Sequence, residues 1–82
     1  MPYIKLTDRY ELTEEGQLPA SGGELNYLFT KHILDYLTLV DMSYANLNSA
    51  IGALECCKLE LYRRMVAPYE DTKIKENGDV YT

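Results

Sequence analysis

The fold is decided by residues 44–67, which read YANLNSAIGALECCKLELYRRMVA. Apolar side chains recur here at steps of three and four residues, the spacing of one face of an α-helix. Lys58 interrupts this apolar stripe, which consists of Tyr44, Leu47, Ile51, Leu54, Leu61 and Met65. A second stripe has small side chains that let another backbone approach closely: Ala45, Ser49, Gly52 and Cys56. We therefore expect a helix over residues 44–67 with two stripes that need cover.

A second helix is expected upstream, over residues 23–40. Its apolar positions share one face: Leu25, Leu28, Phe29, Ile33, Tyr36, Leu37 and Val40. Ser21 followed by Glu24 matches the capping box, in which a serine and a glutamate three residues later satisfy the first backbone N–H groups of a helix. Asp41 and Ser43 mark a tight break, and either side chain can cap the helix that follows. The short connection predicts antiparallel neighbours.

Pro68 predicts a kink or an end to the helix over 44–67, because proline lacks a backbone donor and crowds the preceding turn. A helix over residues 68–76 follows, with Glu70 and Asp71 in its first turn and the Asn77-Gly78 pair as its stop. This segment either continues the preceding helix across a bend or folds back from it. Residues 77–82 are expected to form a tail.

Residues 1–22 are expected to be a lead-in and loop, in which Thr7 caps a short acidic helix over Asp8–Glu15 closed by Gly16. With 82 residues, the chain is expected to be a single all-α domain. Its expected architecture is an antiparallel helical hairpin with a proline-bent C-terminal helix. Two helices cannot enclose both stripes of residues 44–67, so we expect a homo-oligomer, most simply a dimer that forms a four-helix bundle.

Composition excludes several classes of protein. The net charge of −5 argues against general nucleic-acid binding, which needs a basic surface. No apolar run approaches the roughly 20 residues of a membrane span. Cys56 and Cys57 are adjacent, and on a helix they point about 100° apart and cannot bridge each other. We expect reduced, buried thiols in a protein of the cytoplasm.

The sequence carries no recognisable catalytic or metal-binding motif. CxxC, HExxH, GxSxG, GxGxxG and phosphate-binding glycine loops do not occur. His32 is the only histidine, and it is expected at a partly buried or rim position of residues 23–40. We therefore expect no enzyme activity, no metal and no cofactor.

Candidate binding residues concentrate after Leu54, where bulky polar side chains crowd one region. Two interpretations stay open. One is a solvated or interface face, with pairs such as Glu55–Lys58 and Glu60–Arg64. The other is a pocket for an anion or nucleotide, in which an arginine holds phosphate, a tyrosine stacks on a base, and amide or carboxylate groups read polar edges. The candidate residues are Asn26, Asn48, Glu55, Lys58, Tyr62, Arg63, Arg64 and Tyr69.

Several segments resemble a small uncharacterised protein family met in phage and prophage genomes. They cover most of the chain outside Leu6–Gly22 and include Pro2-Tyr3-Ile4, Leu25-Asn26-Tyr27, residues 44–48, 51–55 and 58–64, and Ala67-Pro68-Tyr69-Glu70-Asp71. The resemblance implies a helical fold and a phage-like setting, and it supplies no activity. We expect a non-enzymatic accessory protein that binds a host or phage protein. The alternative is a protein that sequesters a small anionic ligand such as a nucleotide signal.

Overall fold

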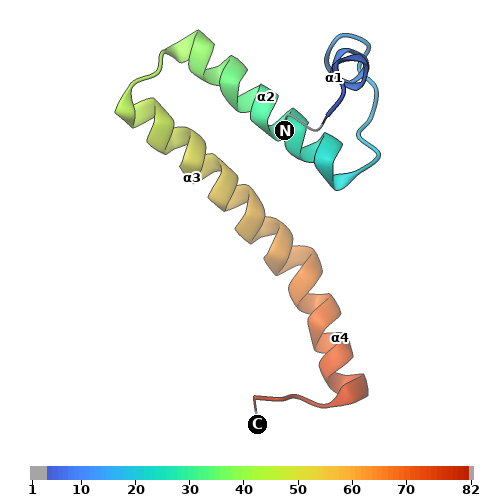
Figure 1. The fold of residues 1–82 in the computed structure, drawn as a ribbon. Coiled ribbons are helices and arrows are strands. Elements are labelled where there is room, and N and C mark those ends of the chain that lie inside the picture. Colours follow the sequence, from blue (N-terminus) through green and yellow to red (C-terminus); the bar gives the residue numbers. More distant parts are fainter. Residues whose placement is uncertain (1–3, 82) are drawn as a thin grey trace. The chain divides into compact units, whose positions relative to one another are not determined.

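The computed structural model describes residues 4–81, and within this range every regular element is helical (Figure 1). The elements are α1 (Leu6–Thr13), α2 (Gly22–Val40), α3 (Tyr44–Leu61), a π-helical turn η1 (Tyr62–Val66) and α4 (Ala67–Asn77). The all-α expectation is confirmed. Residues 1–3 and 82, which include Pro2 and Tyr3 of the family resemblance, lie outside the described range.

The chain separates into two compact units with their boundary between Asn46 and Leu47. In the first unit α1 contacts α2, and the buried apolar side chains are Ile4, Leu12 and Leu37. The second unit contains most of α3, followed by η1, α4 and the residues up to Tyr81. The single domain expected from chain length stays a prediction.

The start of α2 follows the predicted capping box. The Ser21 hydroxyl accepts a hydrogen bond of 3.1 Å from the Glu24 backbone N–H, and the Glu24 carboxylate accepts one of 2.9 Å from the Ala20 N–H. The helix begins at Gly22 and ends at Val40, close to the predicted range of 23–40. The turn that follows is also capped as expected, since the Ser43 hydroxyl accepts the Asn46 N–H at 3.2 Å.

The predicted start of α1 is wrong. Thr7 lies inside the helix, and Lys5 occupies the cap position without a side-chain hydrogen bond. The Arg9 side chain instead donates to the Ile4 carbonyl at 2.9 Å, and Ile4 is buried. Burial of Ile4 and this hydrogen bond together fix the chain just before Leu6, so the helix starts two residues earlier than its acidic side chains suggest.

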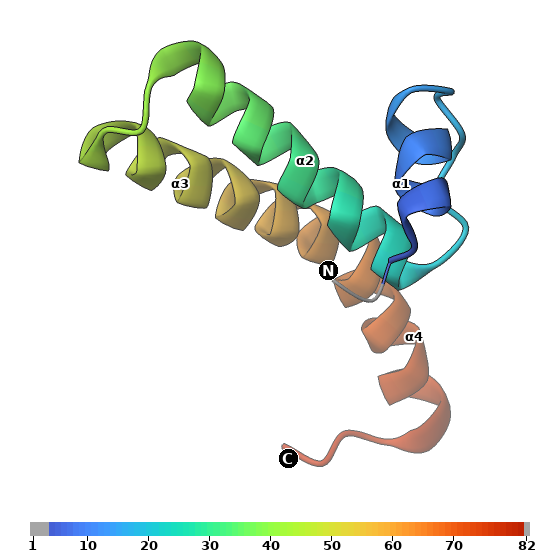
Figure 2. The same ribbon diagram turned by 45° about the horizontal axis from the view of Figure 1, so that its top comes forward.

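The helix does not break at Pro68. It runs on from α3 through η1 into α4, as the uninterrupted ribbon in Figures 1 and 2 shows. Proline in a regular helix would press its ring against the Arg64 carbonyl. The preceding turn is instead widened by one residue, and the Ala67 N–H donates to the Tyr62 carbonyl, five positions back. Such π-turns are a known way to accommodate local strain without ending a helix.

Replacing the proline tests this explanation. In Pro68→Ala the donor is restored and the ring clash is gone, so we expect the widened turn to revert to regular α-helix. The Ala67 N–H should then donate to the Arg63 carbonyl instead of the Tyr62 carbonyl, which couplings measured by NMR across the hydrogen bond report directly. Pro19→Ala, outside the helices, is the matched control. Persistence of the Tyr62 acceptor in Pro68→Ala would show that residues 62–66 encode the π-turn themselves.

Candidate functional site

The eight candidate residues are all exposed, and they are divided between the two units. Asn26 lies on α2 in the first unit. The other seven lie along the second unit: Asn48, Glu55 and Lys58 on α3, Tyr62, Arg63 and Arg64 in η1, and Tyr69 on α4. Tyr62, Arg63 and Arg64 lie together because they are consecutive in the sequence. Asn26 belongs to the other unit and is not shown to share a site with them.

Glu60 engages both arginines of η1. Its carboxylate lies 2.5 Å from the Arg64 Nε and 3.3 Å from an Arg63 terminal nitrogen. Glu55 and Lys58 form a further pair at 3.4 Å. The predicted pairs Glu55–Lys58 and Glu60–Arg64 are confirmed. Exposed pairs of this kind contribute little to folding, but an incoming anion would have to compete with Glu60 for both guanidinium groups.

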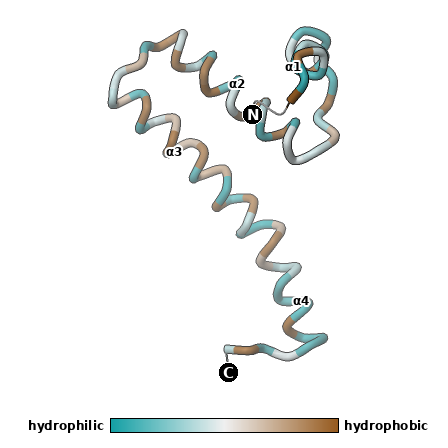
Figure 3. Tube along the Cα trace, viewed as in Figure 1, coloured by the Kyte–Doolittle hydropathy of each residue, from teal (hydrophilic) through white to brown (hydrophobic). Residues whose placement is uncertain are grey.

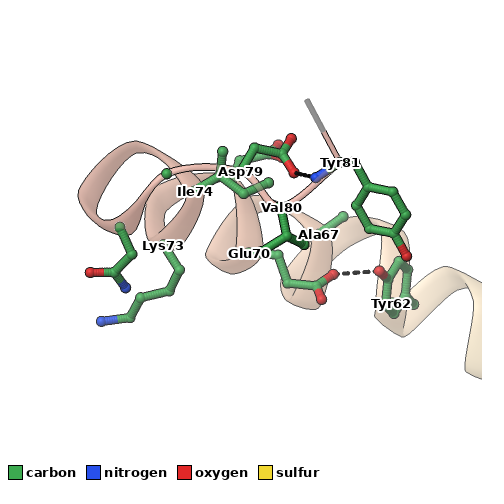
Figure 4. A pocket seen from close by; sticks show the side chains of 11 residues that line it. Tyr62, Ala67, Glu70, Lys73, Ile74, Asp79, Val80 and Tyr81 are labelled. Carbon is green, nitrogen blue, oxygen red and sulfur yellow. Dashed lines mark hydrogen bonds between the residues drawn. The ribbon is translucent and has the colours of Figure 1, made fainter.

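Tyr62 contacts a residue of α4. Its hydroxyl donates to the Glu70 carboxylate, two turns further along the helix (Figure 4). In a regular α-helix, residues eight apart are offset by about 80° around the axis. The extra residue in η1 removes most of that offset, because eight positions then span about the same rotation as seven. The π-turn at Pro68 thus places Tyr62 and Glu70 on one line.

A shallow groove of about 560 Å³ lies along α4 and the segment that follows it. Gly78, with φ of +85°, turns the chain at the end of α4, and the Asp79 carboxylate accepts a hydrogen bond of 2.9 Å from the Tyr81 N–H. The residues that line the groove are Tyr62, Ala67, Glu70, Asp71, Lys73, Ile74, Asn77, Gly78, Asp79, Val80 and Tyr81 (Figure 4). Tyr62 is the one candidate residue among them.

The groove is acidic, which the sequence analysis did not anticipate. Glu70, Asp71 and Asp79 supply three carboxylates against the single ammonium group of Lys73. Arg63 and Arg64 do not line it. Tyr69 also lies outside the lining, and the Lys73 ammonium is 5.6 Å from the centre of its ring, a cation–π distance. The signal for this groove in the sequence is Asn77-Gly78, which predicts a turn but not which side chains the turn gathers.

The expectation that the two cysteines are buried is wrong. Both are free thiols, and both are exposed rather than buried. The physical reason is that, in the part of the second unit that the structure describes, no other helix packs against α3. His32 is likewise exposed. Among residues 4–81, no three histidine, cysteine or acidic side chains are arranged to hold a metal ion.

The fold and the exposed second unit define an all-helical protein whose recognisable feature is a long C-terminal helix, joined through a π-turn. The chain belongs to a family described as a domain of unknown function, DUF6899, whose sequence profile matches residues 1–80. The match extends over both units. Searches of curated proteins and of solved structures find no match to this chain.

The Tyr62–Glu70 contact has a measurable consequence. The hydrogen bond to Glu70, with the charge of that carboxylate, raises the pKa of the Tyr62 phenol above its ordinary value. Because the folded pKa is raised, the contribution of this contact to stability is present below the unfolded pKa and is lost as pH rises through the folded pKa. We expect Glu70→Gln to lower the Tyr62 pKa toward the ordinary value, followed by NMR of ¹³C-labelled tyrosine.

Glu76→Gln is the control for that titration. Glu76 pairs with Lys73 on the same helix at 3.2 Å, so the variant removes the same charge without removing the Tyr62 contact. An identical Tyr62 titration in Glu70→Gln and in the unmodified protein would contradict the assigned hydrogen bond.

Proposed function

We propose that this protein is a non-enzymatic accessory protein that acts by binding another protein through its C-terminal helical unit. The partner is a host or phage protein, in line with the phage-like setting that the family resemblance implies. The proposal also places the protein in the cytoplasm of the host cell. Within residues 4–81, no helix is both long and apolar enough to cross a membrane.

The observation that carries this proposal is the uncovered apolar surface of the second unit. Apolar residues recur along α3 and α4, where the trace in Figure 3 is brown. Ile51 and Met65 are each 66% exposed and Leu61 is 55% exposed. A helix of this kind cannot bury its own side chains. Helices in proteins gain most of their stability when an apolar face packs against another part of the structure. Exposed apolar surface flanked by polar groups is typical of a protein-binding site.

Self-association belongs to the same proposal. We propose that residues 22–40 and 44–61 pair as an antiparallel hairpin and that two copies combine into a four-helix bundle. The two stripes of α3 support this, since Leu54 and Gly52 are two positions apart and so point to nearly opposite sides of the helix. One helix packed on α3 covers one of these sides and leaves the other for a second contact.

The alternative, a protein that sequesters a small anion such as a nucleotide, has weaker support. A phosphate site requires guanidinium groups that converge on one cavity. Here both arginines of η1 are engaged by Glu60, and the groove along α4, which neither arginine lines, has three carboxylates. The exposed, apolar face of the second unit favours a protein partner over a small anion.

Substitution of the η1 side chains tests the proposed binding. Tyr62→Ala, Arg63→Ala and Arg64→Ala should each lose the protein that the unmodified chain retains on purification from producing cells. Helix content should stay the same, because exposed pairs contribute only ~0–1 kcal/mol to folding. Lys75→Ala, a basic side chain of α4 outside the candidate set, is the matched control. Binding of the identified protein is then measured with purified components by calorimetry.

Three results would contradict the proposal. The first is that all three variants bind the purified partner as tightly as the unmodified protein does. The second is a nucleotide or other anion retained in stoichiometric amount and lost on substitution of Arg63 or Arg64, which would favour sequestration. The third is loss of folding in all three variants, which would assign these side chains to the structure of the helix.

A further inference from the structure

A seven-residue repeat runs through α3 from its first residue to its last. The repeat consists of Tyr44, Leu47, Ile51, Leu54, Lys58 and Leu61, at intervals of three, four, three, four and three. This alternation is the pattern of the core positions in a coiled coil, conventionally a and d. In that notation Tyr44, Ile51 and Lys58 are a positions, and Leu47, Leu54 and Leu61 are d positions. A single lysine at an a position is a feature that specifies register and partner number at some cost in stability.

The repeat is not used within its own unit. Among the described residues of the second unit, 47–81, no other helix packs beside α3. The central a positions are open, with Ile51 at 66% exposure and the Lys58 side chain at 71%. The repeat also ends where regular helix ends, because η1 widens the next turn and rotates the following side chains out of phase. The six side chains of the repeat therefore form a defined patch of α3, which we call the seam.

We propose that this seam binds the seam of a second copy of the chain, as an antiparallel pair in which Leu54 faces Lys58 and Ile51 faces Leu61. This inference rests on the proposed binding function and adds the surface, the orientation and the register of self-association. The arrangement is self-complementary about a twofold axis near Cys56, so each copy contributes the same residues in reverse order. Within the overlapping stretch, residues 51–61, each a position is then opposite a d position, as antiparallel pairing requires, and Tyr44 and Leu47 lie beyond it.

The charges select the orientation. A parallel pair in register would set the two Lys58 side chains directly against each other, which is unfavourable at an interface. In the antiparallel register each Lys58 lies beside Glu55 of the other copy, the residue next to its Leu54. Glu55 and Lys58 are already within 3.4 Å of each other in one chain. Two such pairs, one on each side of the axis, satisfy both lysines.

The charges also select the register. Shifting one copy by a full repeat would place Lys58 opposite Leu47. The neighbours there would be Tyr44 and Asn48, and no carboxylate would be within reach of the ammonium group. The stripe on the far side of α3 offers no comparable choice, since Ala45, Ser49, Gly52 and Cys56 carry no charge and a side chain added at Gly52 would meet open space. The charges of the seam therefore favour one register of pairing over the others.

A charge exchange tests the proposed pairing in the full-length chain. Sedimentation equilibrium should show that Lys58→Glu and Glu55→Lys each raise the dimer dissociation constant at least about tenfold, because each places like charges together at the interface. The double variant Lys58→Glu/Glu55→Lys should recover dimerisation. A parallel pair would show no such loss and recovery, because Glu55 and Lys58 do not meet across it and Lys58→Glu only exchanges one like-charge contact for another, and that result would overturn the proposal.

The native cysteines provide the second arm of the experiment. Cys57 borders the seam near the twofold axis, whereas Cys56 lies on the opposite stripe. A short bismaleimide should join two copies of Cys56→Ser, which retains Cys57, and should fail to join Cys57→Ser. Gly52→Leu should leave the dimer intact. Preferential linkage through Cys56, or dissociation by Gly52→Leu, would place the contact on the small-residue stripe and overturn the proposed seam.

The test of self-pairing and the test of partner binding can fail separately. A chain that sediments as a monomer at all concentrations, yet binds its purified partner through η1, would refute self-pairing and leave the proposed function standing. If the double variant recovers dimerisation but the chain retains no other protein on purification, self-pairing would be supported and the proposed function refuted.

Discussion

A single helix has no interior in which to bury its apolar side chains. From Leu47 to Asn77 the chain is helical and without another helix of its own unit beside it. Helix formation is cooperative, but the first turn is unfavourable to form, so helices in water rely on packing of an apolar face. The leucines and isoleucine of α3 can therefore lower the free energy of the folded chain only when something outside the unit covers them. This constraint is the physical basis of the proposed binding function.

Continuity at Pro68 is what makes one long helix out of two segments. Had the proline ended the helix, α3 and α4 would be separate elements that could pack on each other, and the second unit would have its own small core. The π-turn preserves continuity by inserting one residue into the turn that precedes the proline. The same insertion brings Tyr62 into line with Glu70 and ends the seven-residue repeat of α3. A single local adjustment thus separates the apolar seam from the acidic groove.

Local signals in the sequence predicted local structure well. The capping box at Ser21, the range of α2 and the pairs made by Glu55 and Glu60 all depend on residues three or four positions apart, where spacing alone determines proximity. The start of α1 was wrong because burial of Ile4, a tertiary effect, outweighs the preference of Thr7 for a cap. Burial of the cysteines was wrong for a related reason: the composition of a stripe does not reveal whether anything covers it.

The candidate site was predicted less completely. Proline signals a disturbance, but a break, a bend and a π-turn share that signal, and only the π-turn aligns Tyr62 with Glu70. The acidic groove depends on the backbone reversal at Gly78, which brings Asp79 and Tyr81 toward α4. Of the eight candidate residues only Tyr62 lines this groove, and the arrangement of the side chains around it follows from two backbone features that periodicity does not encode.

The central claim is that α3 is stabilised by contacts from outside its unit. Amide hydrogen exchange measured over a series of protein concentrations tests it most directly, since exchange reports the free energy of local opening. Protection of residues 51–61 is expected to rise with concentration as copies associate. Strong protection of these amides that is unchanged upon dilution, in a chain that remains monomeric and free of partners, would contradict it.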